Sequence, residues 1–291
     1  MSDSPDPFAP VELRAADGAC ARVLPYGAHL LSWVPAPTAP GGAAERLFVS
    51  EQAVSRAGVA IRGGVPVIFP QFGPEGPLPR HGFARTRPWT LVRAGHDAGG
   101  AAEAVFALGD DAETRALWPH AFRATLAVRA AGAWLEVALG VEHAGGPGEA
   151  PLAFTAALHT YLRVGDVEAV RVRGLEEARY RDQAADGALG GPDGGPLAVR
   201  GEVDRVYVGV PAAEVDDPVV GTRTRATHAG FADIVVWNPG ATLAAGLADL
   251  DPGGWRRMLC VEAAAVERPV VLAPGARWAG RQRLEAREVV A

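Results

Sequence analysis

Two neighbouring stretches decide the fold, Phe122-Arg-Ala-Thr-Leu-Ala-Val-Arg129 and Trp134-Leu-Glu-Val-Ala-Leu-Gly-Val141. In the first, Phe, Ala, Leu and Val alternate with Arg, Thr and Ala. In the second, Leu and Val alternate with Trp, Glu, Ala and Gly. A period of two is typical of β-strands, because successive side chains point to opposite faces of the sheet. The two stretches therefore predict strands with one buried face and one mixed face.

The strand signal extends outward from this pair. Residues 11–24 carry strand-like residues around an Asp17-Gly18 turn, which is a hairpin signal. Further strands are expected at 26–33, 154–162, 170–172, 205–210, 234–237, 258–262, 270–272 and 278–284. We expect one or two helical turns at 51–58, an exposed glycine-rich loop at 186–196 and no long amphipathic helix. Many short strands separated by turns predict an all-β sandwich or barrel.

Length and composition limit the classes of protein. The 291 residues suit a single domain over 1–291, in which we expect 1–10 to be a loose N-terminal segment. The net charge of −6 argues against nucleic acid as a partner, and two cysteines are too few for a disulfide framework. No apolar run reaches membrane-spanning length and the start carries no apolar signal region, so we expect a cytoplasmic protein without a membrane partner.

Several familiar catalytic motifs are missing from the sequence. There is no phosphate-binding Gly-Lys-Ser/Thr loop, no Cys-x-x-Cys, no His-Glu-x-x-His and no Gly-x-Ser-x-Gly. The side chains that remain for chemistry are His, Glu, Asp and Arg. They suit proton transfer combined with recognition of an anion.

The stretch from Ile61 to Arg85 concentrates such residues. It begins Ile-Arg-Gly-Gly-Val-Pro, passes through a Pro/Gly-rich loop and ends Pro-Arg-His-Gly-Phe-Ala-Arg. Its paired glycines allow a close backbone approach or a positive φ, and its prolines argue against a central strand. From composition alone, the segment could equally be a stiff connection whose arginines are solvated.

The sequence of this stretch resembles that of the hexose-6-phosphate mutarotases, the glucose-6-phosphate 1-epimerase branch of the aldose 1-epimerase superfamily. The matching runs are Ile61-Arg-Gly-Gly-Val-Pro66, Pro70-Gln-Phe-Gly73 and His81-Gly-Phe-Ala-Arg85, and the resemblance recurs over most of the chain. It implies an all-β fold, a large antiparallel β-sandwich of the galactose mutarotase type. It also implies interconversion of the α and β anomers of an aldohexose 6-phosphate, without a cofactor or metal.

The resemblance assigns two catalytic residues. His159 lies in Leu-His-Thr-Tyr, resembling the family segment that supplies the general acid. Glu262 ends Cys-Val-Glu, resembling the segment that supplies the general base. The family usually continues with Pro-Gly after this glutamate, whereas this chain has Ala263-Ala264.

Further residues are assigned to substrate binding. Asp204, in Glu-Val-Asp-Arg-Val-Tyr, resembles the family's acceptor for a sugar hydroxyl, with Val203 in place of the usual threonine. Arg62 and Arg85 would hold the phosphate, because guanidinium groups match phosphate oxygens. Arg80 and His81 could add a contact. The expected partner is a small hexose phosphate, and we expect a monomer.

Other readings stay open at this stage. A free-sugar aldose 1-epimerase would share His159 and Glu262 but would not need both arginines. A carbohydrate-binding sandwich without catalysis, or a sensing or scaffold protein on the same fold, is also compatible with the sequence. The Trp237-Asn238-Pro239 run and the acidic stretch 249–251 match family regions that we interpret as scaffold. His29, His96, His120, His143 and His228 have no motif context and are interpreted as surface or core residues.

Overall fold

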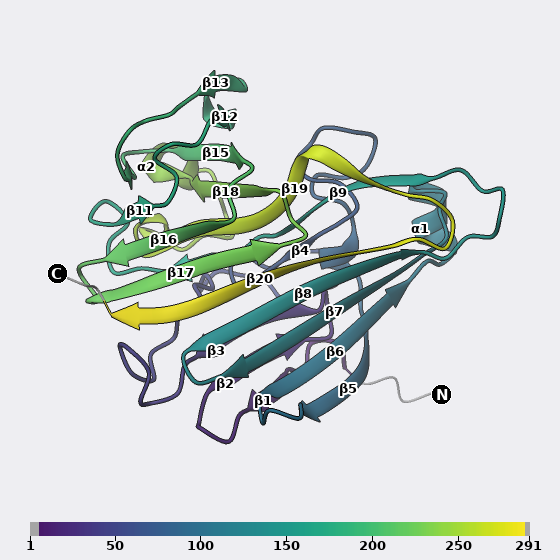
Figure 1. Ribbon diagram of the computed structural model, residues 1–291, viewed down its shortest axis with the longest axis horizontal. Coiled ribbons are helices and arrows are strands. Elements are labelled where there is room, and N and C mark those ends of the chain that lie inside the picture. Colours follow the sequence, from purple (N-terminus) through teal and green to yellow (C-terminus); the bar gives the residue numbers. More distant parts are fainter. Residues whose placement is uncertain (1–5, 289–291) are drawn as a thin grey trace.

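The computed structural model describes residues 6–288, which fold into two large antiparallel sheets and one small sheet (Figure 1). Sheet I has nine strands in the order β14-β11-β16-β17-β20-β8-β7-β6-β5, and sheet II has eight, in the order β13-β12-β15-β18-β19-β9-β4 with β10 beside β19. The small sheet has the order β1-β2-β3. The arrangement is an all-β antiparallel sandwich and confirms the expected fold class.

The elements have the following bounds. Sheet I contains β5 (Thr90–His96), β6 (Ala102–Gly109), β7 (Phe122–Ala131), β8 (Trp134–His143), β11 (Arg171–Arg173), β14 (Leu197–Ala198), β16 (Ala212–Asp217), β17 (Thr222–Ala229) and β20 (Arg277–Glu288). Sheet II contains β4 (Val67–Ile68), β9 (Leu152–Leu158), β10 (Tyr161–Arg163), β12 (Tyr180–Asp182), β13 (Ala188–Gly190), β15 (Val203–Val208), β18 (Asp233–Asn238) and β19 (Met258–Leu272). The small sheet contains β1 (Val11–Arg14), β2 (Cys20–Leu24) and β3 (His29–Val34). The helices are short: α1 (Ala112–Leu117), α2 (Gly240–Ala244) and the 3₁₀ turns η1 (Ala84–Thr86), η2 (Gln183–Ala185) and η3 (Gly254–Arg257).

The main core lies between the two large sheets. Leu126 of β7 and Leu139 of β8 are fully buried and share one apolar cluster with Phe154 of β9 and Val261 of β19. Burial alternates residue by residue along β7 and β8, as the period-two pattern predicts. Burial of such side chains is the main favourable contribution to folding, about 25 cal/mol per Å² of apolar surface.

One local expectation is wrong, and two expected strands are confirmed as parts of a single longer one. Residues 51–58 form turns rather than a helix. The strands expected at 258–262 and 270–272 are parts of one long strand, β19, whose pairing with β9 is interrupted by a register shift between Ala265 and Val270. At the position where the family usually has Pro-Gly, Ala263 and Ala264 pair in register with Leu158 and Ala157 of β9. Strand β19 therefore continues through the two positions at which this chain differs from the family. Alanine supplies the backbone N–H that proline lacks.

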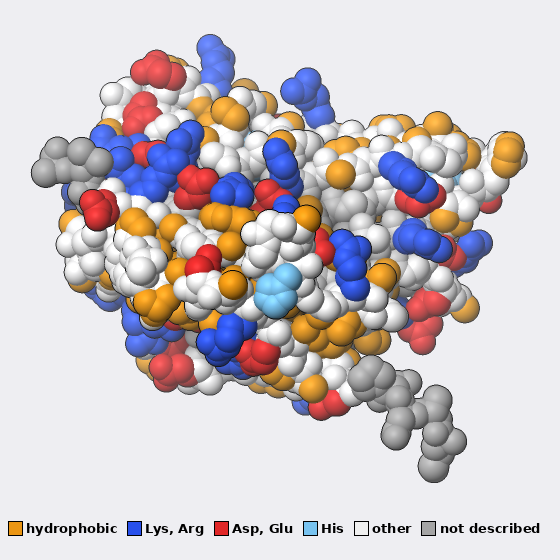
Figure 2. Space-filling model, turned by 60° about the horizontal axis from the view of Figure 1, so that its bottom comes forward, with side chains coloured by type: hydrophobic (Ala, Val, Ile, Leu, Met, Phe, Trp, Pro, Cys, Tyr) orange, Lys and Arg blue, Asp and Glu red, His pale blue; other side chains and the backbone are white. Residues whose placement is uncertain are grey.

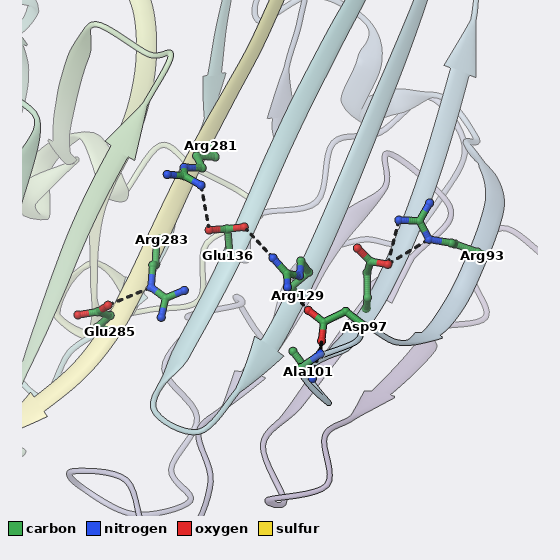
Figure 3. Close-up of polar contacts among 10 residues, drawn as sticks. Arg93, Asp97, Ala101, Arg129, Glu136, Arg281, Arg283 and Glu285 are labelled. Atoms are coloured by element: carbon green, nitrogen blue, oxygen red, sulfur yellow. Dashed lines mark hydrogen bonds and ion pairs between the residues drawn. The ribbon is translucent and has the colours of Figure 1, made fainter.

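The outer face of sheet I carries a row of ion pairs (Figure 3). Glu136 of β8 contacts Arg129 of β7 at 3.5 Å and Arg281 of β20 at 3.9 Å, and Arg129 also contacts Asp97. Arg283 pairs with Glu285 along β20 at 2.9 Å. We call these residues the ion-pair ladder. On the face drawn in Figure 2, basic and acidic side chains likewise stand near one another.

The N-terminal segment is described in part. Residues 1–5 of the expected loose segment lie outside the described residues. Within 6–10, the ring of Phe8 packs 4.7 Å from that of Tyr26, and the Tyr26 backbone N–H donates to Pro7 O. Among the described residues, the model contains no helix whose length and apolar character would let it cross a membrane.

Candidate active site

A pocket of about 420 Å³ opens on the outer face of sheet II. Period two explains its position: Val261 and Ala263 of β19 face the core, so Glu262 between them faces outward. The pocket volume lies in the range of small-molecule sites. All seven residues assigned from the sequence line this pocket, namely Arg62, Arg80, His81, Arg85, His159, Asp204 and Glu262.

His159 and Glu262 form a buried pair on adjacent strands. His159 follows β9 and Glu262 lies on β19, and their Nε2 and Oε1 atoms are 3.4 Å apart. Their exposed fractions are 8% and 1%. His159 Nδ1 and Glu262 Oε2 have no hydrogen-bond partner among the described residues. Buried polar atoms are rarely left unpaired, so these two atoms are available to a ligand.

The environment disfavours charge on both members of the pair. Burial raises the pKa of Glu262 well above its usual range, and the nearby carboxylate of Asp204 adds to this. Burial lowers the pKa of His159 well below its usual range, and so do His81 and the pocket arginines. Burial therefore stabilises the uncharged form of each side chain relative to its charged form. An imidazolium acid beside a carboxylate base differs from that uncharged pair by the transfer of one proton from Glu262 to His159.

The two main arginines converge on this pocket but differ in their partners. The Arg62 guanidinium donates to both oxygens of Asp249, at 3.1 and 3.2 Å, and to Tyr161 Oη at 3.1 Å. Arg85 donates to Arg80 O at 3.1 Å, and no carboxylate lies within ion-pair distance of it among residues 6–288. Its Nε is buried without a partner. Arg85 therefore brings an uncompensated positive charge to the pocket.

The paired glycines of the organising stretch place Arg62. Gly63 and Gly64 have φ values of 116° and 63°, which L side chains rarely adopt. A Cβ would lie 2.3 Å from Phe48 O at the first position and 2.2 Å from Leu30 O at the second. Only glycine lets the backbone pass so close to these two segments. The expected close backbone approach is thus confirmed.

His81 and Asp204 line the pocket beside the pair. The His81 ring lies 5.8 Å from that of His159, edge to face, and its backbone has a φ of 68°. Burial and three nearby arginines, Arg85 first, lower the pKa of His81 to about 3. Burial raises the pKa of Asp204, on β15, to about 6. His81 is therefore a neutral hydrogen-bonding group at neutral pH.

Two residues assigned to the scaffold belong to the site. Trp237 lines the pocket, with its ring 6.0 Å from that of His159 and 5.9 Å from the Arg62 guanidinium. Asp249 binds the Arg62 guanidinium, and no spacing in the sequence predicts this contact. Tyr161 stacks on His159 at 4.8 Å. Tyr161 follows His159 by two residues, so a strand would place both side chains on one face. This spacing was the one sequence signal that Tyr161 shares the site of His159.

A buried glutamine links the segments that carry His159 and Glu262 to sheet I. Gln282 of β20 accepts from Thr160 Oγ1 through its Oε1 and donates to Val261 O at 2.9 Å. Thr160 follows His159, and Val261 precedes Glu262. Gln282 therefore holds the two neighbouring backbone segments from behind, without lining the pocket.

The sequence carries no metal-binding motif, yet in the structure donor atoms of His159, Cys260 and Glu262 lie within 4.8 Å of one another. Cys260 and Glu262 are two residues apart on β19, but His159 is distant from both in sequence, so no motif spacing reveals the cluster. The remaining histidines, His29, His96, His120, His143 and His228, do not line the pocket.

Comparison with known proteins places the chain in a family. Residues 10–285 match the family model of aldose 1-epimerase. The chain belongs to the aldose 1-epimerase family, whose members are isomerases. The β-sandwich and the outward-facing His–Glu pair described above agree with this membership.

Particular relatives narrow the comparison. A Cenchrus ciliaris protein is 35% identical over 97% of this chain and 86% of its own length. An Escherichia coli protein is 38% identical over 88% of this chain and 85% of its own length. Both carry the name "Putative glucose-6-phosphate 1-epimerase". The crystal structure of a Salmonella typhimurium protein, titled "putative mutarotase (YeaD)", superposes with a TM-score of 0.83 at 30% identity, covering 93% of this chain and 88% of that one.

Proposed function

We propose that this protein interconverts the α and β anomers of an aldohexose 6-phosphate. The observation that carries the proposal is the buried His159–Glu262 pair, 3.4 Å apart, in a pocket that also contains the unpaired cation Arg85. The name shared by the Cenchrus ciliaris and Escherichia coli relatives supports the same substrate class.

The pair can open and close the sugar ring. Glu262 takes the proton of the C1 hydroxyl while His159 gives a proton to the ring oxygen, so the C1–O5 bond breaks and the aldehyde forms. Rotation about C1–C2 presents the other face of the aldehyde. Ring closure then returns one proton to the new C1 hydroxyl and the other to His159. The reaction needs no redox equivalent, and protons balance over the cycle.

Arg85 and Arg62 suit the phosphate end of the substrate. The charge of Arg62 is matched by Asp249, so Arg85, with Arg80 beside it, supplies the net attraction for a dianion. The same arginines contribute to the low pKa of His159, after burial and His81. A bound phosphate would offset their field and raise that pKa, which favours the imidazolium form required for protonation of the ring oxygen.

The free-sugar epimerase remains the second candidate. It would use the same acid–base pair, but it gives no role to Arg85, a pocket arginine without a carboxylate partner among residues 6–288. Charge-assisted hydrogen bonds contribute roughly 1.5–3 kcal/mol each, so an arginine that binds phosphate has a measurable signature.

The deciding experiment compares Arg85→Ala on two sugars. We expect kcat/KM for glucose 6-phosphate to fall about ten- to a hundred-fold, mainly through KM, because about 1.4 kcal/mol corresponds to a factor of ten. Turnover of free glucose should be low and nearly unchanged. Arg283→Ala, which removes an arginine of the ion-pair ladder, is the matched control and should affect neither sugar. Equal losses on both sugars would favour the free-sugar epimerase.

A further inference from the structure

Cys260 lies directly behind the catalytic pair. It precedes Glu262 by two residues on β19, so both side chains point to the outer face of sheet II. Cys260 has no exposed surface and packs with Tyr161, the residue whose ring stacks on His159. The proposed reaction gives this thiol no role.

The three side chains have the donor types and spacing of a transition-metal site. Zn²⁺ binds thiolate sulfur at about 2.3 Å and imidazole nitrogen or carboxylate oxygen at about 2.0–2.2 Å. In a tetrahedral site these lengths place donor atoms about 3.3–3.6 Å apart. His159 Nε2 and Glu262 Oε1 are already 3.4 Å apart, and all three donor groups lie within 4.8 Å. The thiol needs to move by only about an ångström, within the reach of a side-chain adjustment.

The triad also has unused coordinating capacity. Among residues 6–288, His159 Nε2 and Glu262 Oε1 contact only each other, Glu262 Oε2 is buried without a partner, and no hydrogen bond engages the Cys260 thiol. A cation therefore displaces few existing interactions. His159 and Glu262 line the pocket whereas Cys260 lies behind them, so water or a sugar hydroxyl from the pocket can supply a fourth ligand.

We propose that His159, Cys260 and Glu262 form an inhibitory site for a thiophilic divalent cation such as Zn²⁺, which on binding blocks the acid–base pair. The inhibitory effect rests on the proposed function, because the cation would occupy the atoms that move the protons. Binding itself depends only on the three donor groups.

Charge and ligand type favour Zn²⁺ over hard cations. A bound cation requires Cys260 as thiolate, Glu262 as carboxylate and His159 as neutral imidazole, so the thiol proton and any proton on the other two groups pass to solvent on binding. The two negative charges of the thiolate and the carboxylate match the cation. Thiolate selects Zn²⁺ over Mg²⁺ and Ca²⁺, which prefer oxygen ligands. Arg85 opposes cation binding, and a sugar phosphate in the pocket would compete for the same space.

Direct binding is the first test, with Co²⁺ as the spectroscopic probe and Zn²⁺ as the competitor. Wild-type protein should show a thiolate-to-cobalt charge-transfer absorption at one equivalent per chain, lost on adding Zn²⁺ and unaffected by Mg²⁺. Cys260→Ser should lose the absorption. Cys20→Ser is the matched control and should keep the absorption, because Cys20 lies on β2 of the small sheet, whose strands contribute no residue to the pocket lining. An absorption that survives in Cys260→Ser, or is missing in wild type, would overturn the inference.

Inhibition is the second test and separates this inference from the proposed function. Zn²⁺ should inhibit anomer exchange by wild type and Cys20→Ser, in competition with glucose 6-phosphate and reversibly on adding chelator. Cys260→Ser, and Cys260→Ala as a second variant, should exchange anomers at near wild-type rates and resist Zn²⁺. If the cobalt absorption appears in a protein without exchange activity, the function fails while the site stands. If exchange is normal and Zn²⁺ inhibits all variants equally, the site fails while the function stands.

Discussion

The outer faces of the two large sheets use charge in opposite ways. On sheet I, the guanidinium groups of the ion-pair ladder lie against carboxylates at the surface, as Arg129 does with Asp97 and Glu136 (Figure 3). On sheet II, Glu262 and His159 are buried, and each has a polar atom without a partner. On the first face every arginine of the ladder has a carboxylate partner within the protein, although the Nε of Arg129 is itself unpaired. The second face leaves its unpaired polar atoms to be satisfied by a ligand, which is the physical mark of a functional site.

The largest effect should come from removing either member of the buried pair. Glu262→Gln keeps the shape of the side chain but cannot accept a proton, and His159→Asn cannot donate one to the ring oxygen. We expect each to slow anomer exchange of glucose 6-phosphate by about 10²–10⁴-fold. Exchange NMR on folded variants measures the loss. Activity within about threefold of wild type would remove that residue from the mechanism.

Asp204→Asn should reveal the stability cost of a buried pocket charge. The pKa of Asp204 is raised to about 6, so the folded protein holds this proton more tightly than the unfolded chain does. Wild-type stability is therefore lost as pH rises from about 4 to 6, and the asparagine variant avoids this loss. Relative to wild type, the variant should gain on the order of 1–3 kcal/mol across that window. Denaturant unfolding at both pH values checks the sign, and a constant difference would contradict it.

A smaller effect should follow from Gln282→Leu. Gln282 lies outside the pocket but holds the segments next to His159 and Glu262, so its loss should misplace the pair. We expect kcat to fall about tenfold with KM unchanged, since small misplacements of catalytic groups cost about that much or more. Gln282→Glu, which keeps the acceptor for Thr160, should recover part of the rate. A lower melting temperature with normal kcat would assign Gln282 to stability alone.

The smallest effect should come from the ion-pair ladder. Arg281 is 62% exposed and lies 3.9 Å from Glu136, and exposed ion pairs contribute about 0–1 kcal/mol. Arg281→Ala should change the free energy of unfolding by less than about 1 kcal/mol and leave the exchange rate unchanged. A large loss of activity would contradict the proposal that the outer face of sheet II carries the site and the outer face of sheet I does not.

Much of the fold could be predicted because burial imposes a period of two. The alternation at 122–129 and 134–141 gives β7 and β8, and the Asp17-Gly18 turn gives the β1–β2 hairpin. The continuity of β19 could not be predicted, because its interior contains a register shift and carries the half-buried Glu267 and the exposed Arg268. Residues 51–58 could form a helix locally, but the structure forms only turns there.

The site was predictable where side chains lie in recognisable runs. His159, Glu262, Arg62 and Arg85 come from such runs, and the structure brings them into one pocket. Asp249, Gln282 and Cys260 were not found. Their roles arise from contacts between segments as distant as 187 residues, in the case of Arg62 and Asp249. Such pairings depend on the register of strands and loops in space, which a single sequence does not specify.

The most direct test of the central claim is exchange NMR on wild-type protein with glucose 6-phosphate and glucose at equal concentration. Transfer of magnetisation between the α and β H1 signals measures anomer exchange without a coupled enzyme. The account predicts that catalytic amounts of protein strongly accelerate exchange of glucose 6-phosphate and accelerate that of glucose far less. Exchange of glucose 6-phosphate at its spontaneous rate, or equal acceleration of both sugars, would contradict it.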